Sequence, residues 1–291
     1  MGRKKHSIQK EIFSFLILFA FSSNLSSDIE DKIALHKEQF SEVALKIWEY
    51  AELGYQETKS SNLLASELKK EGFKITKGVA GIPTAFVAEF GSSGPVIGIL
   101  GEFDALPGLA QTNSPFKEVA VNDSGGGHAC GHHLFGAASA WAAVSIKEWL
   151  DENDVEGTVR FYGTPAEEGG SGKVYMVREG LFDDVDVVLH WHPDDVNSAN
   201  PKTSNSNKSA KFTFKGISAH AAGSPELGRS ALDGVEAMNM MVNMMREHIP
   251  QESRMHYVIT KGGLAPNVVP DLAEVYYYVR HPEMKVVEEL F

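Results

Sequence analysis

Three histidines and the only cysteine of the chain fall within six positions, in the segment GGGHACGHH at residues 125–133. A single residue separates Cys130 from His132. Sulfur and imidazole donors suit divalent transition metals such as Zn²⁺, Mn²⁺ or Co²⁺ better than they suit Mg²⁺ or Ca²⁺. Histidines also often cap helices or satisfy backbone groups, so this cluster by itself leaves a metal site and a structural role both open.

Carboxylates and a further histidine follow predicted strands. Glu167 and Glu168 are adjacent and come after the strand expected at residues 157–162. Since the two side chains point in different directions, one can ligate a metal while the other faces a bound water as general base. His192 also follows a predicted strand, as does Asp104, which could orient a metal-ligating imidazole. A solvated loop or a structural histidine explains each position alone, but their joint occurrence favours a metal centre.

Alternating helices and strands must position these residues. We expect helices at residues 28–51, 60–71, 134–150 and 172–180, and strands at 84–90, 96–101, 157–162 and 185–190. This alternation indicates an α/β fold with a mostly parallel sheet covered on both faces. Ligands in such folds bind beyond the carboxyl ends of the strands. The apolar strand at 185–190 is expected to be buried.

A second pattern follows a segment rich in Asn, Ser, Lys and Pro at residues 194–209, which predicts a linker. We expect strands at residues 211–215, 255–260 and 274–280, a long Met-rich helix at 230–248, and a helix from residue 284 onward. This β-α-β-β-α order is the ferredoxin-like layout without its last strand. The sequence therefore predicts two domains, a catalytic one at 28–205 and a second one at 206–291.

The first 27 residues have the layout of a secretory signal peptide. Basic residues come first, an apolar run follows at residues 12–21, and a small polar stretch ends the segment. The apolar run is about half as long as a membrane-spanning helix. We therefore expect a secreted or periplasmic protein, with a cytoplasmic one as the alternative.

The overall composition excludes several function classes. The formal net charge of -12 repels phosphate backbones, so we expect no nucleic-acid partner. A single cysteine excludes an internal disulfide. A redox role for Cys130 is a poor explanation, because no second cysteine exists to resolve an oxidised intermediate.

Several long segments carry a family resemblance. They are GEFDALPGLAQ (101–111), GHACGHHLFGAA (127–138), TVRFYGTPAEEGGSGKVYMVREGLFDDVD (158–186), WHP (191–193), FKGISAHAAGSPELGRSALDGVEAMN (214–239) and GGLAPNVVPDLAEVYYYVR (262–280). In these segments the chain resembles the M20 metallopeptidase superfamily, and within it the amidohydrolase branch. The resemblance runs from about residue 32 to the end.

The resemblance implies a metal-assisted amide hydrolase that uses one or two Zn²⁺ or Mn²⁺ ions. It also implies a catalytic domain of the zinc-peptidase type into which a lid and dimerisation domain is inserted. The residues that match the family's metal ligands are Cys130, His132, Glu168 and His192. Glu167 matches the carboxylate that activates the attacking water.

The remaining matches concern substrate binding and support of the metal. His220 matches a lid histidine that reaches a neighbouring subunit's active site and polarises the scissile carbonyl, and Asn267 matches a lid residue near the substrate. Asp104 matches a position that supports the metal, while Glu102 stands where the wider superfamily has a histidine. Arg229 has an ordinary surface pattern, but a substrate carboxylate needs a cation, and Arg can bind it bidentately.

These matches predict a metal-dependent amidohydrolase acting on an N-acyl or N-aroyl amino acid, with a dipeptidase of the same superfamily as the alternative. We expect a homodimer formed through the lid domain, or a hetero-oligomer with a related subunit. Relatives carry a further segment with a last metal-ligating histidine, and the residues after His281 offer none. The resemblance therefore also implies that both domains are truncated, and an inactive fragment that acts only in dimerisation is the remaining alternative.

Overall fold

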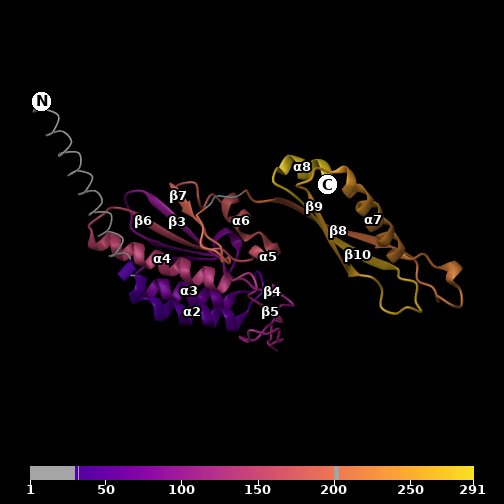
Figure 1. The fold of residues 1–291 in the computed structure, drawn as a ribbon, viewed down its shortest axis with the longest axis horizontal. Helices are drawn as coiled ribbons and strands as arrows, with labels where there is room; N and C mark the ends of the chain where they lie inside the picture. The colour runs from indigo at the N-terminus through magenta and orange to yellow at the C-terminus, as the bar shows by residue number, and fades with distance from the viewer. Residues whose placement is uncertain (1–29, 32, 200–202) are drawn as a thin grey trace, which may run out of the picture. The chain divides into compact units, whose positions relative to one another are not determined.

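The computed structural model describes residues 30–31, 33–199 and 203–291, and divides into two compact units (Figure 1). The first unit ends at Val196, somewhat earlier than the boundary expected at 205/206. The predicted signal peptide at 1–27 lies outside the described residues. No helix in the described ranges combines the length and apolar character needed to cross a membrane.

A five-stranded sheet forms the centre of the first unit, in the order β1-β2-β6-β3-β7. Its strands are β1 (Lys74–Lys77), β2 (Phe86–Phe90), β3 (Val96–Gly101), β6 (Thr158–Gly163) and β7 (Val187–Leu189). β6, β3 and β7 pair in parallel, whereas β2 pairs antiparallel with both β1 and β6. Four of the five strands therefore run in the same direction, which agrees with the predicted mostly parallel sheet.

Helices cover both faces of this sheet. Alternate residues of the strands point to opposite sides, so each face contributes side chains that pack against helices. The helices of the first unit are α2 (Lys37–Tyr50), α3 (Thr58–Lys70), α4 (His132–Glu152), α5 (Glu167–Gly170), α6 (Gly172–Arg178) and the 3₁₀ turn η1 (Val79–Gly81). Phe161 of β6 packs in a cluster with α2, α3 and α4, while the next residue, Tyr162, packs with Met176 of α6. The hydrophobic core of this unit therefore has two parts, one on each face of the sheet.

Several parts of the first unit differ from the sequence-based expectation, among them β1, which was not expected. The strand expected to be buried at 185–190 is exposed, since Val187, Val188 and Leu189 are 51%, 43% and 48% accessible. That prediction was wrong because β7 lies at the edge of the described sheet and pairs only with β3. The short strands β4 (Leu106–Pro107) and β5 (Gly126–Gly127) pair with each other and were not expected.

The second unit is a three-stranded antiparallel sheet with helices. Its elements are β8 (Ser206–Lys215), η2 (Pro225–Leu227), α7 (Ala231–Met245), η3 (Arg246–His248), β9 (Arg254–Lys261), β10 (Leu272–His281) and α8 (Met284–Leu290). The sheet order is β8-β10-β9, and the predicted β-α-β-β-α sequence is confirmed. The predicted linker was too long, because residues 206–209 pair with residues 278–281 of β10. Ladder hydrogen bonds hold this polar segment as strand despite its composition.

Candidate metal centre

The ends of β3 and β6 bring the candidate residues to one edge of the central sheet. The two strands are in register up to the pair Gly101 and Gly163, so both end at the same level. Thr164 ties the two ends together, since its backbone N–H and its hydroxyl both donate to the Gly101 carbonyl, at 2.9 and 3.1 Å. The segment after β3 then supplies Asp104, and the segment after β6 supplies Glu168.

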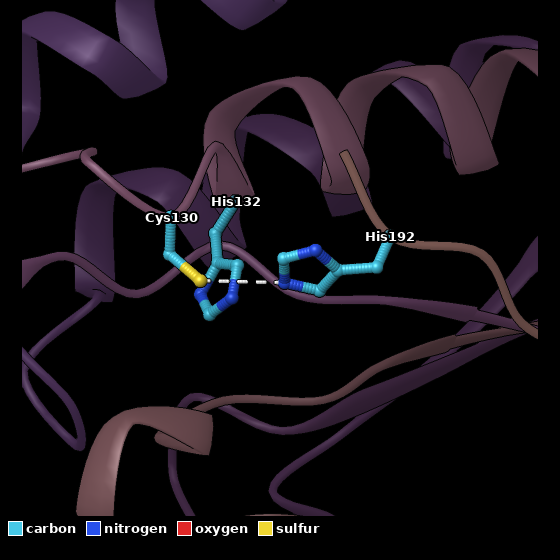
Figure 2. Close-up of side chains that lie close together, drawn as sticks. All are labelled: Cys130, His132 and His192. Carbon is cyan, nitrogen blue, oxygen red and sulfur yellow. Dashed lines mark hydrogen bonds between the residues drawn. The ribbon is translucent and has the colours of Figure 1, made fainter. Parts of the chain in front are cut away.

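Cys130, His132 and His192 bring their donor atoms within 4.8 Å of one another (Figure 2). Cys130 Sγ lies 3.3 Å from His192 Nε2. His132 is fully buried at the start of α4, and its Nδ1 lies 3.0 Å from Asp104 Oδ1. His192 Nδ1 likewise lies 2.9 Å from the Pro193 carbonyl. If each Nδ1 carries the proton that these acceptors require, both Nε2 atoms present a lone pair to the centre.

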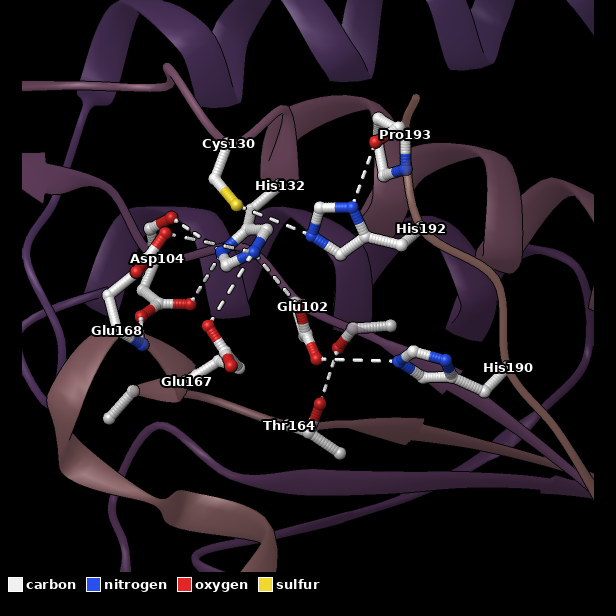
Figure 3. Close-up of polar contacts among 12 residues, drawn as sticks. Glu102, Asp104, Cys130, His132, Thr164, Glu167, Glu168, His190, His192 and Pro193 are labelled. Atoms are coloured by element: carbon white, nitrogen blue, oxygen red, sulfur yellow. Dashed lines mark hydrogen bonds and ion pairs between the residues drawn. The ribbon is translucent and has the colours of Figure 1, made fainter. Parts of the chain in front are cut away.

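Three glutamates complete the surroundings of His132 Nε2 (Figure 3). Glu102 Oε2 lies 3.0 Å from Nε2, Glu167 Oε2 lies 3.9 Å away and Glu168 Oε1 lies 4.0 Å away. The side chain of Glu167 is 45% exposed, whereas that of Glu168 is 17% exposed. Glu167 is therefore the carboxylate that faces solvent, and Glu168 faces the protein interior.

Asp104 links two of these groups. Its Oδ1 accepts from His132 Nδ1, and its Oδ2 accepts from the backbone N–H of Glu168 at 2.8 Å. The carboxylate therefore fixes the orientation of the imidazole and the position of the glutamate loop at the same time. A carboxylate that orients an imidazole in this way could support a metal ligand, and this role of Asp104 stays a prediction.

Negative charge accumulates in this centre. Burial and the neighbouring Glu168 raise the pKa of the Cys130 thiol to about 12. Burial alone would lower the pKa of His132, but Asp104 and Glu102 raise it to about 10. Burial, with Glu102 and Glu168 nearby, also raises the pKa of Glu167. A divalent cation placed here would offset this charge, favour the ionised thiol and carboxylates, and replace the proton that Glu102 otherwise favours on His132 Nε2.

Whether the residues fit a metal can be judged from buried ligand-type atoms whose hydrogen-bonding capacity the protein leaves unsatisfied. Within the described part of the chain, Glu168 Oε1 has no hydrogen-bond partner, while Glu102 Oε2 and His132 Nε2 have only their mutual contact as an ion pair at 3.0 Å. All three are ligand-type atoms, and the two carboxylate oxygens lie within 4.0 Å of Nε2. One thiol, two imidazoles and carboxylates also form a donor set that suits Zn²⁺ and similar ions. The residues present therefore fit a divalent metal.

Two contributors to the site were missed by the sequence analysis. The Lys173 ammonium contacts Glu102 Oε1, and His190 Nε2 lies 3.7 Å from the same oxygen. With Glu167 they line a cavity of about 290 Å³. The sequence analysis gave His190 no role, and it noted only that Glu102 stands where the wider superfamily has a histidine. The available sequence signal for Lys173 was its position shortly after the acidic pair, at the start of a predicted helix.

The other predicted residues belong to the second unit. His220 forms an isolated antiparallel bridge with Val268, and the Asn267 carbonyl accepts from the Ala221 N–H at 3.0 Å. The structure thus brings His220 and Asn267 together within this unit. Arg229 is exposed and is joined through its backbone to Ile217. The roles of these three residues toward a substrate stay predictions.

A second group of possible metal donors joins three helices of the first unit. His36, Glu71 and Glu148 have donor atoms within 4.8 Å of one another. His36 Nε2 contacts Glu148 Oε1 at 2.8 Å, and Gln39 donates to Glu71 at 3.3 Å. Burial lowers the pKa of His36, but Glu148 and Gln39 raise it above its usual value. The group therefore acts as an ion pair between helices.

Comparisons with known proteins agree with this geometry. The family model described as Peptidase family M20/M25/M40 matches residues 98–277, more than half of the chain. One of the subunits of the Escherichia coli K12 p-aminobenzoyl-glutamate hydrolase is 47% identical over 264 residues, covering 90% of this chain and 55% of that protein. The Xaa-Arg dipeptidase of Mus musculus is 31% identical over 266 residues, covering 87% of this chain and 57% of that protein.

A solved structure shares the fold. It is a dinuclear metal-binding peptidase of the M20 family from Bacillus subtilis, with a TM-score of 0.54 at 23% sequence identity, covering 88% of this chain and 70% of that one. The chain therefore spans somewhat more than half the length of the two curated relatives and a larger share of the solved structure.

Proposed function

The chain belongs to peptidase family M20/M25/M40, and from this premise we propose that it is the metal-binding part of an amidohydrolase acting on N-acyl or N-aroyl amino acids. The observation that carries the proposal is the convergence of one thiol, two imidazoles and two glutamates around His132 Nε2. Three separate segments of the first unit supply these groups. Such a set of donors supports hydrolysis with a metal-activated water.

The residues divide into ligands and a proton carrier. Cys130, His132, Glu168 and His192 would hold Zn²⁺ or Mn²⁺, as one ion or two. When bound, the metal supplies a Lewis acid that lowers the pKa of water and polarises an amide oxygen. Glu167, the most exposed of the glutamates around His132, would take the proton from the attacking water and return it to the leaving amine. No acyl-enzyme is required.

The second unit would supply the lid. In this proposal His220 polarises the scissile carbonyl, Asn267 contacts the substrate and Arg229 binds its carboxylate. The bridge that joins His220 to Val268, the residue after Asn267, supports a shared role for His220 and Asn267. Arg229 is exposed, and its guanidinium would bind a carboxylate bidentately.

The substrate class rests on similarity. The 47% identity to the E. coli p-aminobenzoyl-glutamate hydrolase chain favours an aroyl-glutamate. The 31% identity to the mouse Xaa-Arg dipeptidase makes a dipeptide the second candidate. Pocket contacts rather than the metal-binding motif set such a choice, so only a panel of substrates separates the two.

Oligomerisation through the second unit is part of the same proposal. The E. coli relative is named as a subunit, which supports a hetero-oligomer, and the second unit exposes an apolar surface that supports a homodimer. Exposed apolar residues of α7 and β9 include Met240, Met241, Met244, Val258 and Ile259. We expect Met244→Glu to shift a dimer to monomer in analytical ultracentrifugation, while Met284→Glu on α8 serves as control.

Two measurements test the function. Metal analysis of the purified chain should find bound Zn²⁺ or Mn²⁺, removable by a chelator. Hydrolysis of p-aminobenzoyl-glutamate should be lost on chelation and restored by metal, and an Xaa-Arg panel should be cleaved more slowly. A folded chain that cannot bind these ions would refute the proposal. A chain that binds metal without turnover, yet dimerises, would support the inactive alternative.

A further inference from the structure

We propose that Glu57 is a positioning residue for the metal centre. Its carboxyl group holds in place the loop that carries Glu167 and Glu168. The inference rests on the proposed function, because it assigns this loop a role in binding metal. Glu57 comes just before α3 and is 109 residues away from Ala166 in sequence. The family match at 98–277 does not include Glu57, and the sequence analysis gave it no role.

The contact between Glu57 and the loop is direct and buried. Glu57 is 0% exposed, and its Oε1 accepts from the backbone N–H of Ala166 at 2.7 Å. Its Oε2 accepts from the Thr84 hydroxyl at 3.1 Å. Burial raises the pKa of Glu57 to about 7. Burying a carboxyl group costs free energy, which its hydrogen bonds to Ala166 and Thr84 offset. An apolar side chain could not make these bonds.

The loop needs such support because its backbone is unfavourable. Ala166 has a φ of 55°, in the left-handed region that residues with a Cβ rarely adopt. The next two residues are Glu167 and Glu168, so the conformation of Ala166 sets where both carboxylates point. Asp104 accepts the N–H of Glu168, two residues further on. Two buried carboxylates therefore hold alternate amides of one short loop.

The segment that carries Glu57 packs closely along the same loop. A Cβ on Gly54 would lie 3.1 Å from both Cα and Cβ of Ala166, so the two backbones approach closely there. The Tyr55 hydroxyl donates to the Gly170 carbonyl at 2.5 Å. Residues 54–57 thus contact the loop at its start and at its end, and Glu57 makes the buried polar contact.

The same segment offers a matched control in Glu52. Its carboxylate accepts from the N–H groups of Lys59 and Ser60, at 3.0 and 2.9 Å, and from the Ser60 hydroxyl. It therefore anchors the start of α3 through side-chain hydrogen bonds of the same kind. These bonds do not involve the loop at 164–170. Loss of Glu52 should lower stability without moving the glutamates.

The experiment compares Glu57→Ala, Glu57→Gln and Glu52→Ala in the full chain. Co²⁺ binding is titrated through the thiolate-to-cobalt absorption of Cys130, at a temperature where every variant is folded by circular dichroism. We expect Glu57→Ala to weaken Co²⁺ binding by about 10- to 100-fold, the usual effect of losing a group that supports a ligand. Glu57→Gln should bind within about threefold of the parent, because an amide oxygen can still accept from Ala166.

Hydrogen exchange on the metal-free chain gives a second readout that does not depend on metal binding. In Glu57→Ala the amides of residues 164 and 166–170 should exchange faster by about tenfold, the equivalent of one lost hydrogen bond. Glu52→Ala should leave these amides and the Co²⁺ affinity unchanged. If the parent chain binds no Co²⁺, the proposed function fails, while exchange still decides whether Glu57 holds the loop. Unchanged exchange and affinity in Glu57→Ala, or equal losses in Glu52→Ala, would overturn the inference.

Discussion

Replacing Asp104 with Asn tests the metal centre most directly, because the change keeps the shape of the side chain and removes one acceptor. Asp104 accepts from His132 Nδ1 at 3.0 Å and from the Glu168 N–H at 2.8 Å. An asparagine has a single acceptor oxygen, so one of these bonds is lost. If its NH₂ group faces His132, it favours the tautomer with the proton on Nε2, and the lone pair for the metal is removed.

The expected loss of metal affinity in Asp104→Asn can be estimated in two ways. Losing a hydrogen bond to a charged group costs about 1.5–3 kcal/mol. Changes to groups that orient metal ligands weaken metal binding by about 10- to 100-fold, which equals about 1.4–2.7 kcal/mol. The two ranges agree, so we expect the dissociation constant for Zn²⁺ or Co²⁺ to rise by one to two orders of magnitude.

Competitive titration against a chelator of known affinity measures this change. Asp151→Asn is the matched control, because Asp151 lies on the helix that begins at His132 and pairs only with Lys147 among the ion pairs of the described residues. The control should bind metal like the parent. If Asp104→Asn folds and its dissociation constant stays within about twofold, too small a change for a lost charged hydrogen bond, then Asp104 does not orient the ligands.

Three further predictions concern catalysis, pH and packing. Glu167→Gln should lower the hydrolysis rate by about 100-fold or more while metal content is unchanged, and loss of metal instead would make Glu167 a ligand. Burial and the nearby His133 lower the pKa of His128 to about 4 in the folded chain. As the pH falls below about 6.5, His128 is therefore protonated in the unfolded chain before it is protonated in the folded chain. Chemical denaturation should therefore show the parent losing about 3 kcal/mol between pH 7 and pH 4 relative to His128→Gln, and equal pH profiles would contradict this. Gly136→Ala should lower the melting temperature despite alanine's better helix propensity, because its Cβ would lie 2.6 Å from the Glu102 carbonyl oxygen; a higher melting temperature would show that α4 can shift.

The extent to which the sequence predicted the structure depends on whether local or distant contacts decide the outcome. β3 was predicted at 96–101 and lies there, because its apolar residues and the flanking glycines are local features. Cys130 and His132 were identified by residue type and spacing. The exposure of β7 was not predictable, because it depends on which strands pair beside it. Glu57 was missed because its partner is a backbone amide in a distant segment, and backbone amides carry no sequence pattern.

The same reasoning explains the partial result for Glu102. Its position, where the wider superfamily has a histidine, was noted, but only the fold shows that its Oε2 lies 3.0 Å from His132 Nε2. Lys173 was missed because its contact with Glu102 spans 71 residues. Local patterns therefore located the centre, while the groups that tune its charge became visible only in three dimensions.

The dispersal of the centre along the chain has a consequence for biosynthesis. Its groups come from four stretches, at residues 102–104, 130–132, 167–168 and 192, joined only when β3 and β6 are side by side. A nascent polypeptide that has emerged as far as His132 lacks Glu167, Glu168 and His192, so it offers only part of the proposed ligand set. If these residues hold the ion as proposed, its complete coordination requires that His192 has left the ribosome. In the proposed site, loading of the ion would therefore be a late event.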